Sequence, residues 1–397
     1  MPANDIMDAS GQQVRFSADT LLDSTHIEFR THFRRFVLSC LAEPAARGER
    51  ERVFPTEVYG LLRDAGYLAP DYPETINGGG GDILSACIYY EELTRIPAGV
   101  SAGVFAHQHL AIRPILELGT DDQRARYLAP ALRAERIGAF ALTEPDAGSD
   151  VQGIRTRATR DAQGWVLNGS KIYITNGTIA DYYVLAARTS PERKPDALSL
   201  FLVDRDSAGL AASALDKLGN HSSSTALVSL DGVRVPAQAL LGQVGSGLAQ
   251  LKDTLTSGRI IQATRGLGIA QVAMEKTLQY ARDRQAFGRP IGEFQAVGFR
   301  VAEMASRIEA ARMMVYSAAR DFMAGRPCGQ AASMAKFMTA DAVIFATQHA
   351  VSLHGGYGYM EESGIARLFR DGPESYIGEG TPDIQLRIIA RQMGMHC

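Results

Sequence analysis

Two glycines flank a single carboxylate near the end of the chain, in the segment Ile377-Gly-Glu-Gly-Thr381. A carboxylate that is kept out of water has a raised pKa and can remove a proton from a weakly acidic carbon. The glycines beside Glu379 would leave room for a flat ligand to approach the backbone. By themselves these residues fit a surface glutamate in a glycine turn equally well, so both interpretations stay open at this point.

Two further segments, rich in polar residues and glycine, lie in the middle of the chain. The first reads Phe140-Ala-Leu-Thr-Glu-Pro-Asp-Ala-Gly-Ser-Asp150 and the second Gly169-Ser-Lys-Ile-Tyr-Ile-Thr-Asn-Gly177. Alone, the first is a polar loop of turn formers whose Asp and Ser could cap a helix or turn. The occurrence of all three segments in one chain is what carries information.

Composition narrows the class of protein. The chain has 397 residues, of which 46% are hydrophobic and 21% charged, and its formal net charge is -3. That balance gives no basic surface for a nucleic-acid partner. No window approaches the roughly 20 apolar residues of a membrane span, and the first residues lack a secretory pattern, so we expect a soluble cytoplasmic protein. The four cysteines are scattered and lack metal-ligand spacing, so no metal site is predicted.

The elements that must position these segments change character along the chain. Apolar residues recur with helical spacing over 24–46, and further helices are predicted at 56–65, 83–95, 103–118 and 121–132. Strand-like runs occupy 165–230, and helical spacing returns over 251–282, 294–325, 330–353 and 382–393. This order predicts an α+β fold with a β domain between two helical domains, over residues 1–138, 139–240 and 241–397.

In order and spacing, the three segments resemble the acyl-CoA dehydrogenase family, from the first helix to about Arg391. The resemblance implies an N-terminal helical domain, a middle β-barrel or sheet domain and a C-terminal four-helix bundle. It also implies FAD-dependent α,β-dehydrogenation of an acyl thioester, in which Glu379 removes the α-proton and the flavin takes the β-hydride. Some members carry the base on a helix, directly before the Arg that corresponds to Arg259. Here that position is Gly258, which favours Glu379.

The resemblance assigns the flavin ring to residues of all three segments. Most relatives carry Trp where this chain has Tyr173, and either ring can pack on the flavin face, although a strand aromatic in the core is the alternative. The residues that match the family's ring site are Phe140, Leu142, Thr143, Ser149, Tyr173, Thr175 and Thr381.

A second group of residues matches two parts of the family: segment 284–295 matches the part that reaches the diphosphate and adenosine of FAD from a neighbouring subunit, and segment 354–358 matches a glycine-rich stretch that passes beside the cofactor. Arginine can hold phosphate oxygens in bidentate fashion, and glycine lets the backbone approach closely. Ser352 stands where relatives often carry Gln. The resemblance therefore implies a homo-oligomer, a dimer or a tetramer, whose shared site uses Arg284, Phe287, Gln295, Ser352, Gly355 and Gly356.

The resemblance also places the substrate. Ser149 and Arg259 match positions that meet the pantetheine and nucleotide parts of CoA, and Gly378 and Gly380 flank the base. Segment 217–225 departs from the family's usual loop, so a carrier-protein thioester, which has the same pantetheine arm, remains an alternative to acyl-CoA. Gly378 occupies a place where relatives usually carry Tyr, which predicts either a wider acyl pocket or a different grip on the acyl chain.

Residues 105–114 match the floor of the acyl pocket and include His107, Gln108, His109 and Arg113. We interpret this as a helix whose polar side faces solvent. If His109 or Arg113 points inward instead, the substrate carries a carboxylate or hydroxyl group. Lys171 and Lys336 are interpreted as solvated charges.

The resemblance implies an electron-transferring flavoprotein as the electron acceptor. An acyl oxidase or flavin monooxygenase on the same fold is a second interpretation, but such monooxygenases need no carboxylate base. A non-enzymatic helical scaffold is a third, which the retained base, arginine and glycines disfavour. The acyl group, the acceptor and a degradative or biosynthetic place in fatty acid metabolism stay open.

Overall fold

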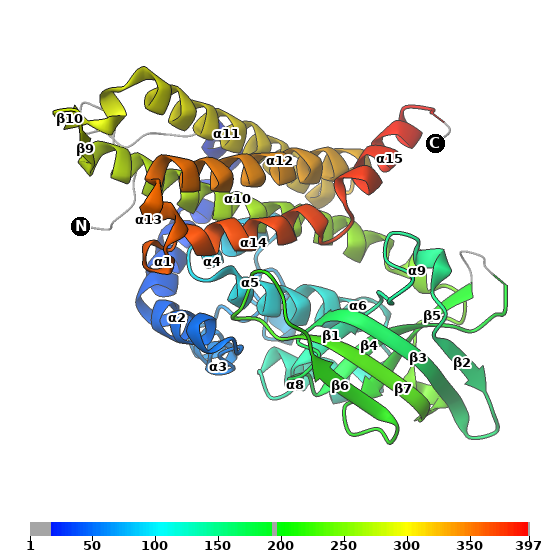
Figure 1. The fold of residues 1–397 in the computed structure, drawn as a ribbon. Helices are drawn as coiled ribbons and strands as arrows, with labels where there is room; N and C mark the ends of the chain where they lie inside the picture. The colour runs from blue at the N-terminus through cyan, green and yellow to red at the C-terminus, as the bar shows by residue number, and fades with distance from the viewer. Residues whose placement is uncertain (1–16, 193–196, 396–397) are drawn as a thin grey trace.

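A computed structural model describes residues 17–192 and 197–395. Its elements follow the predicted order of helices, strands and long helices, with the sheet set below and to one side of the C-terminal helices (Figure 1). Within the described ranges no helix combines the length and apolar character needed to cross a bilayer. The same ranges contain no group of three or more His, Cys, Asp or Glu side chains placed to hold a metal ion.

The N-terminal part is helical. The helix predicted over 24–46 is one helical run, in which a π-helical turn, η2 (Val37–Leu41), joins two α-helices. A second π-helical turn, η4 (Ala106–Ile112), interrupts the helix predicted over 103–118. The α-helices of this part are α1 (Ser24–Phe36), α2 (Ala42–Glu51), α3 (Glu57–Asp64), α4 (Ile83–Leu93), α5 (Ala98–Phe105), α6 (Arg113–Leu118), α7 (Asp121–Gln123) and α8 (Ala129–Leu132).

The middle part is one eight-stranded sheet. Its main path runs β6-β7-β3-β2-β4-β5-β8, and β1 pairs in parallel with β4. Alternating apolar side chains of these strands point to one side and form the buried core of this part. The π-helical turn η4 of the N-terminal part packs against β1. The strands are β1 (Gly138–Ala141), β2 (Arg157–Arg160), β3 (Gly164–Thr175), β4 (Tyr182–Arg188), β5 (Leu198–Asp204), β6 (Leu210–Ala214), β7 (Thr225–Pro236) and β8 (Leu240–Leu241).

Long helices form the C-terminal part. Helix α12 packs against α10, α11 and α14, and buried alanines keep these helices close. A short hairpin of β9 (Gln285–Ala286) and β10 (Arg289–Pro290) joins α10 to α11. The helices are α9 (Gly247–Gln250), α10 (Lys252–Asp283), α11 (Gln295–Met323), α12 (Gly329–His354), α13 (Gly356–Tyr359), α14 (Ile365–Ile377) and α15 (Pro382–Gln392).

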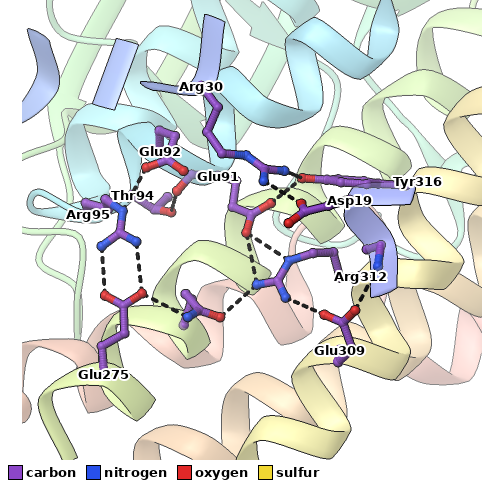
Figure 2. A network of polar contacts seen from close by, with 12 residues as sticks. Asp19, Arg30, Glu91, Glu92, Thr94, Arg95, Glu275, Glu309, Arg312 and Tyr316 are labelled. Carbon is purple, nitrogen blue, oxygen red and sulfur yellow. Dashed lines mark hydrogen bonds and ion pairs between the residues drawn. The ribbon is translucent and has the colours of Figure 1, made fainter. Parts of the chain in front are cut away.

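A buried network of charges joins the N-terminal and C-terminal helices (Figure 2). Arg312 of α11 donates to Glu91 of α4 at 3.1 Å and to Glu309 at 2.8 Å. Arg95 donates to both oxygens of Glu275 on α10, at 2.8 and 2.9 Å. Because the hydrogen-bonding groups come from α4 and the turn after it, from α10 and from α11, the network fixes how α4 sits against α10 and α11.

Candidate functional site

Glu379 lies in the short connection between α14 and α15. Its φ is +53°, in the left-handed region that costs a non-glycine residue conformational energy. Two side chains hold the backbone of this connection in place. Gln385 donates to the carbonyl oxygens of Glu379 and Gly380 at 3.1 and 3.0 Å, and Lys336 donates to the carbonyl oxygen of Gly380 at 3.3 Å. Thr381 then begins α15, with Pro382 in its first turn.

The carboxylate of Glu379 meets α10 at Gly258. A methyl group placed on Gly258 would lie 3.3 Å from Oε2 of Glu379 and 3.7 Å from the ring of His109. Burial raises the pKa of Glu379, while the neighbouring cations Arg259 and Lys336 oppose that rise. Position 258, where some members of the resembled family carry the base, therefore lies next to the carboxylate of Glu379. In this chain only Glu379 supplies a carboxylate there, because residue 258 is glycine.

The raised pKa makes a stability prediction. A carboxyl group with a folded-state pKa above its unfolded value stabilises the fold below the unfolded pKa and loses that contribution as the pH rises through the folded value. Glu379→Gln cannot lose a proton, so the difference between its melting temperature and that of wild type should be constant below about pH 4.5 and should increase as the pH rises above it. Thermal unfolding of both proteins across pH 4–8 measures this. A difference that stays constant with pH would contradict the burial of this carboxyl group.

The space beside Gly378 is occupied by polar side chains. A methyl group placed on Gly378 would lie 2.8 Å from Oε1 of Glu374 and 3.2 Å from Nε2 of Gln262. The missing side chain leaves room for a carboxylate and an amide beside the base, and a wider pocket or a different grip on the acyl chain stays a prediction. That amide donates to both carboxylate oxygens of Glu374, each at 3.1 Å.

The polar residues of η4 are buried, so the interpretation of a solvent-facing polar side is wrong. The exposed fractions of His107, Gln108 and His109 are 0%, 1% and 2%. Burial, with a smaller contribution from Arg113, lowers the pKa of His109 to about 3, so its ring is neutral near pH 7. Arg113 itself pairs with Asp71 and lies over the ring of Tyr72. His109 therefore faces the base, whereas Arg113 is already paired within the N-terminal part.

The two lysines interpreted as solvated are buried instead. Lys171 is 0% exposed and donates to Oε1 of Glu144 at 2.8 Å and to the carbonyl of Leu142 at 2.9 Å. Lys336 is 1% exposed, and burial lowers its pKa to about 8, against the opposing effect of Glu374 and Glu379. The first lysine ties the 140–150 segment to β3, and the second holds the connection that carries Glu379.

The two middle segments lie next to each other, since the amide of Ile172 donates to the carbonyl of Thr143 at 2.9 Å. The pairing of β3 with β7 shifts register between Lys171 and Ile174. Tyr173 lies in this irregularity with a φ of +60°, and its side chain is 68% exposed. Bulges commonly re-aim a side chain, so Tyr173 stands out from the sheet rather than in its core. Around it, Phe140, Leu142, Thr143 and Thr175 are half-buried and Ser149 is exposed.

Another group of predicted residues surrounds an open hollow of about 680 Å³ where α10 ends. Arg284, Ser352, Gly355 and Gly356 line it. Phe287 lies in the β9–β10 hairpin with a φ of +50° and is 95% exposed, and the nearby Gln295, at the start of α11, is also exposed. The predicted residues of this end therefore share one accessible surface.

The two groups are far apart in one chain. Gly258 beside the base and Arg284 after the last residue of α10 are 26 positions apart, which is roughly 39 Å along a helix that rises about 1.5 Å per residue. Figure 1 shows the β9–β10 hairpin and the sheet at opposite ends of the molecule. The structure thus places the predicted residues of the hollow far from the base and from the sheet.

Sequence reasoning missed three residues close to the base, namely Gln262, Arg265 and Glu374. Gly258, Gln262 and Arg265 follow i, i+4, i+7 spacing and so share one face of α10. Polar side chains at that spacing on a largely buried helix were the signal that could have revealed them.

Comparison with known proteins identifies the family. Sequence models of the acyl-CoA dehydrogenase N-terminal, middle and C-terminal domains match residues 23–135, 139–233 and 245–394. The chain belongs to the acyl-CoA dehydrogenase family. Membership confirms the predicted family and fold class, and it makes the protein an FAD-dependent oxidoreductase that acts on the CH–CH bond of an acyl thioester.

Individual members of the acyl-CoA dehydrogenase family are similar over nearly the whole chain. An acyl-CoA dehydrogenase of Bacillus subtilis is 38% identical over 92% of this chain and 97% of its own. The caffeyl-CoA reductase-Etf complex subunit CarC of Acetobacterium woodii is 35% identical over 86% and 90%.

Two solved structures of the acyl-CoA dehydrogenase fold bear on the substrate. Butyryl-CoA dehydrogenase of Megasphaera elsdenii has a TM-score of 0.90 at 35% identity and covers 94% of this chain and 99% of its own. The prolyl acyl carrier protein oxidase AnaB has a TM-score of 0.90 at 29% identity, covering 94% and 100%. Neighbours of this fold therefore include both CoA and carrier-protein enzymes.

Proposed function

We propose that Glu379 removes the α-proton of an acyl-CoA, in a reaction that forms an α,β-unsaturated thioester. The observation that carries this is the half-buried Glu379, whose carboxylate lies against the side-chain-free surface of Gly258 and has its pKa raised by burial. Burial brings the pKa of the carboxyl group closer to that of an activated carbon acid, which favours proton transfer. FAD, when bound, supplies the acceptor for the hydride that leaves the β-carbon.

The residues at both ends of α10 fit FAD. At the sheet, the exposed ring of Tyr173 offers a flat apolar face, and Phe140, Leu142, Thr143, Ser149, Thr175 and Thr381 would surround the flavin ring. At the hollow, Arg284 offers a guanidinium for phosphate oxygens next to the small residues Ser352, Gly355 and Gly356, with Phe287 and Gln295 alongside. Arg284 lies roughly 39 Å along α10 from Gly258, so one FAD is not expected to reach both ends within a single subunit.

That separation supports a shared cofactor site. We infer a homodimer, or a tetramer of two dimers, in which the hollow of one subunit completes the site at the sheet of its partner. The exposure of Phe287 fits this assembly, because an aromatic ring in solvent is a common sign of an interface. We propose that each subunit has three domains, with boundaries at 1–138, 139–240 and 241–397.

A complementation experiment tests the shared site. Arg284→Glu and Glu379→Gln are each expected to inactivate the homo-oligomer, the first by loss of FAD and the second by loss of the base. A mixed dimer, isolated with two different tags, would contain one site with both residues intact, and its dehydrogenase activity should return to about half that of wild type. Mixed dimers as inactive as their parents would show that both residues serve the same subunit's site.

Four of the predicted residues would border the substrate. Ser149 lies on the exposed side of the 140–150 segment, Arg259 is next to Glu379, and Gly378 and Gly380 flank the base, so these residues would border the pantetheine arm and thioester. AnaB supports a carrier-protein thioester as the alternative substrate.

CarC, named as part of an Etf complex, supports an electron-transferring flavoprotein as partner. Anaerobic titration of the purified holoenzyme with short, medium, branched, hydroxylated and carboxylated acyl-CoAs tests the function: a flavin band that none of them bleaches would contradict acyl-CoA as the substrate and favour the carrier-protein thioester.

A further inference from the structure

Side chains of three helical faces meet next to the base. Gly258, Gln262 and Arg265 lie on one face of α10, and Glu374 and Gly378 follow each other by one turn at the end of α14. The third face comes from α5 and η4. Its residues are Ser101, Phe105 and His109, with the rings of Phe105 and His109 stacked at 5.5 Å. The carboxylate of Glu379 lies beside Gly258, and a polar cluster lies further along the same face of α10.

Arg265 is the centre of that cluster and is 1% exposed. Its Nε donates to Oγ of Ser101 at 3.1 Å, and its Nη1 donates to Oε1 of Gln262 at 2.5 Å and to Oε1 of Glu374 at 3.3 Å. Its Nη2 is buried and has no hydrogen-bond partner among the described residues. The ring of Phe105, 5.7 Å from the guanidinium carbon, faces it without offering an oxygen.

An unpartnered guanidinium nitrogen is costly, because a buried donor loses its water without gaining an acceptor. The charge of Arg265, however, is already met by the carboxylate of Glu374. What the site lacks is a hydrogen-bond acceptor rather than a further negative charge. A second carboxylate here would also lie near Glu374 and Glu379, with like-charge repulsion from both.

We propose that the acyl group of the substrate carries an uncharged oxygen, a hydroxyl or carbonyl, which accepts a hydrogen bond from Nη2 of Arg265. This inference rests on the proposed dehydrogenase function, since it assigns the substrate of the same site. Arg265 lies seven residues beyond Gly258 on α10, which is roughly 10 Å along the helix. The oxygen therefore belongs several carbons beyond the α-carbon, where the reaction does not alter it.

The polar cluster also disfavours a plain acyl chain. An apolar chain bound beside Arg265, Gln262 and Glu374 would exclude water from them. It would also leave Nη2 of Arg265 without a hydrogen-bond acceptor. A site built to bond a substrate oxygen discriminates strongly against an analogue that lacks it. Selectivity should therefore appear as poor binding of unsubstituted chains of the same length.

The test compares acyl-CoAs of equal length that carry a hydroxyl, a carbonyl, a terminal carboxylate or no substituent. With the holoenzyme, kcat/KM should be roughly tenfold to a hundredfold higher for the best hydroxyl or carbonyl substrate than for the plain chain, as a hydrogen bond to a charged group allows. Calorimetric binding to Glu379→Gln holoenzyme, in which turnover is expected to be at least a hundredfold slower, should show the same ratio of dissociation constants. Arg265→Met should bring both ratios close to one, whereas Arg320→Met, which removes an exposed guanidinium from α11, should leave them unchanged.

Glu374→Gln provides a second variant in case Arg265→Met fails to fold. It leaves the charge of Arg265 without its carboxylate, so preference should shift towards the carboxylated chain. Equal binding of plain and oxygenated chains by wild type, or a ratio that survives Arg265→Met, would overturn the inference while leaving the dehydrogenase function intact. A wild-type preference for the carboxylated chain would overturn it as well. A holoenzyme that oxidises none of the four acyl-CoAs would instead contradict the proposed function.

Discussion

Glu379→Gln should lower kcat/KM for any acyl-CoA substrate by about 10²- to 10⁴-fold, the usual contribution of a positioned general base. The amide has nearly the same shape but cannot accept the α-proton, and no carboxylate at position 258 can replace it. Binding of FAD should be unaffected, because Glu379 touches the substrate side of the site. Steady-state kinetics and the visible flavin spectrum of the same preparation measure the two quantities.

The matched control is Glu374→Gln, which removes a carboxylate 2.8 Å from the position of a side chain at Gly378 but leaves the base in place. It should change the choice of acyl group and not abolish proton removal. Near-normal turnover by Glu379→Gln, or equal inactivation by both variants, would contradict the assignment of Glu379 as the base.

Arg312→Met should be among the most destabilising substitutions in the molecule. Arg312 is 3% exposed and bonds Glu91, Glu309 and Gln271, while the hydroxyl of Tyr316 donates to the second oxygen of Glu91 at 2.7 Å. Its loss leaves buried carboxylates uncompensated, which typically costs about 3–5 kcal/mol. With an unfolding entropy of about 2.1 cal/mol/K per residue, the melting temperature should fall by roughly 4–6 °C.

Arg326→Met is the corresponding surface control. Arg326 bonds Asp321 at 2.5 Å, but its side chain is 61% exposed, so the pair should contribute no more than about 1 kcal/mol. Differential scanning calorimetry of both variants, at matched protein and FAD concentrations, measures the difference. Similar melting temperatures for the two variants would show that the network in Figure 2 does not hold the helical parts together.

Much of the fold could be predicted because its signals are local. The helices α10, α11, α12 and α15 begin and end within one or two residues of the predicted limits, since their apolar spacing is long and regular. Helix α14 was not predicted. It contains Gly372 and Pro373, two residues that usually break a helix. Packing against α12 and α10 stabilises it in spite of them.

The candidate site was predictable only where one short segment carries the chemistry. Glu379 between its glycines is such a case. The pairing of Lys171 with Glu144 joins residues 27 positions apart, and the cluster of Arg265 joins residues of three helices. Contacts of that kind depend on how elements pack, and no spacing along the sequence reports them.

Tyr173, Phe287 and Glu379 share a feature with a consequence for protein engineering. Each has a left-handed backbone conformation that favours glycine or asparagine, and each was assigned on other grounds to meet the cofactor or the substrate. A screen that rewards heat resistance alone would be drawn to these positions, because relieving the backbone there is an easy gain. The variants from such a screen would have higher melting temperatures, but they would lack the aromatic rings of Tyr173 and Phe287 and the carboxylate of Glu379.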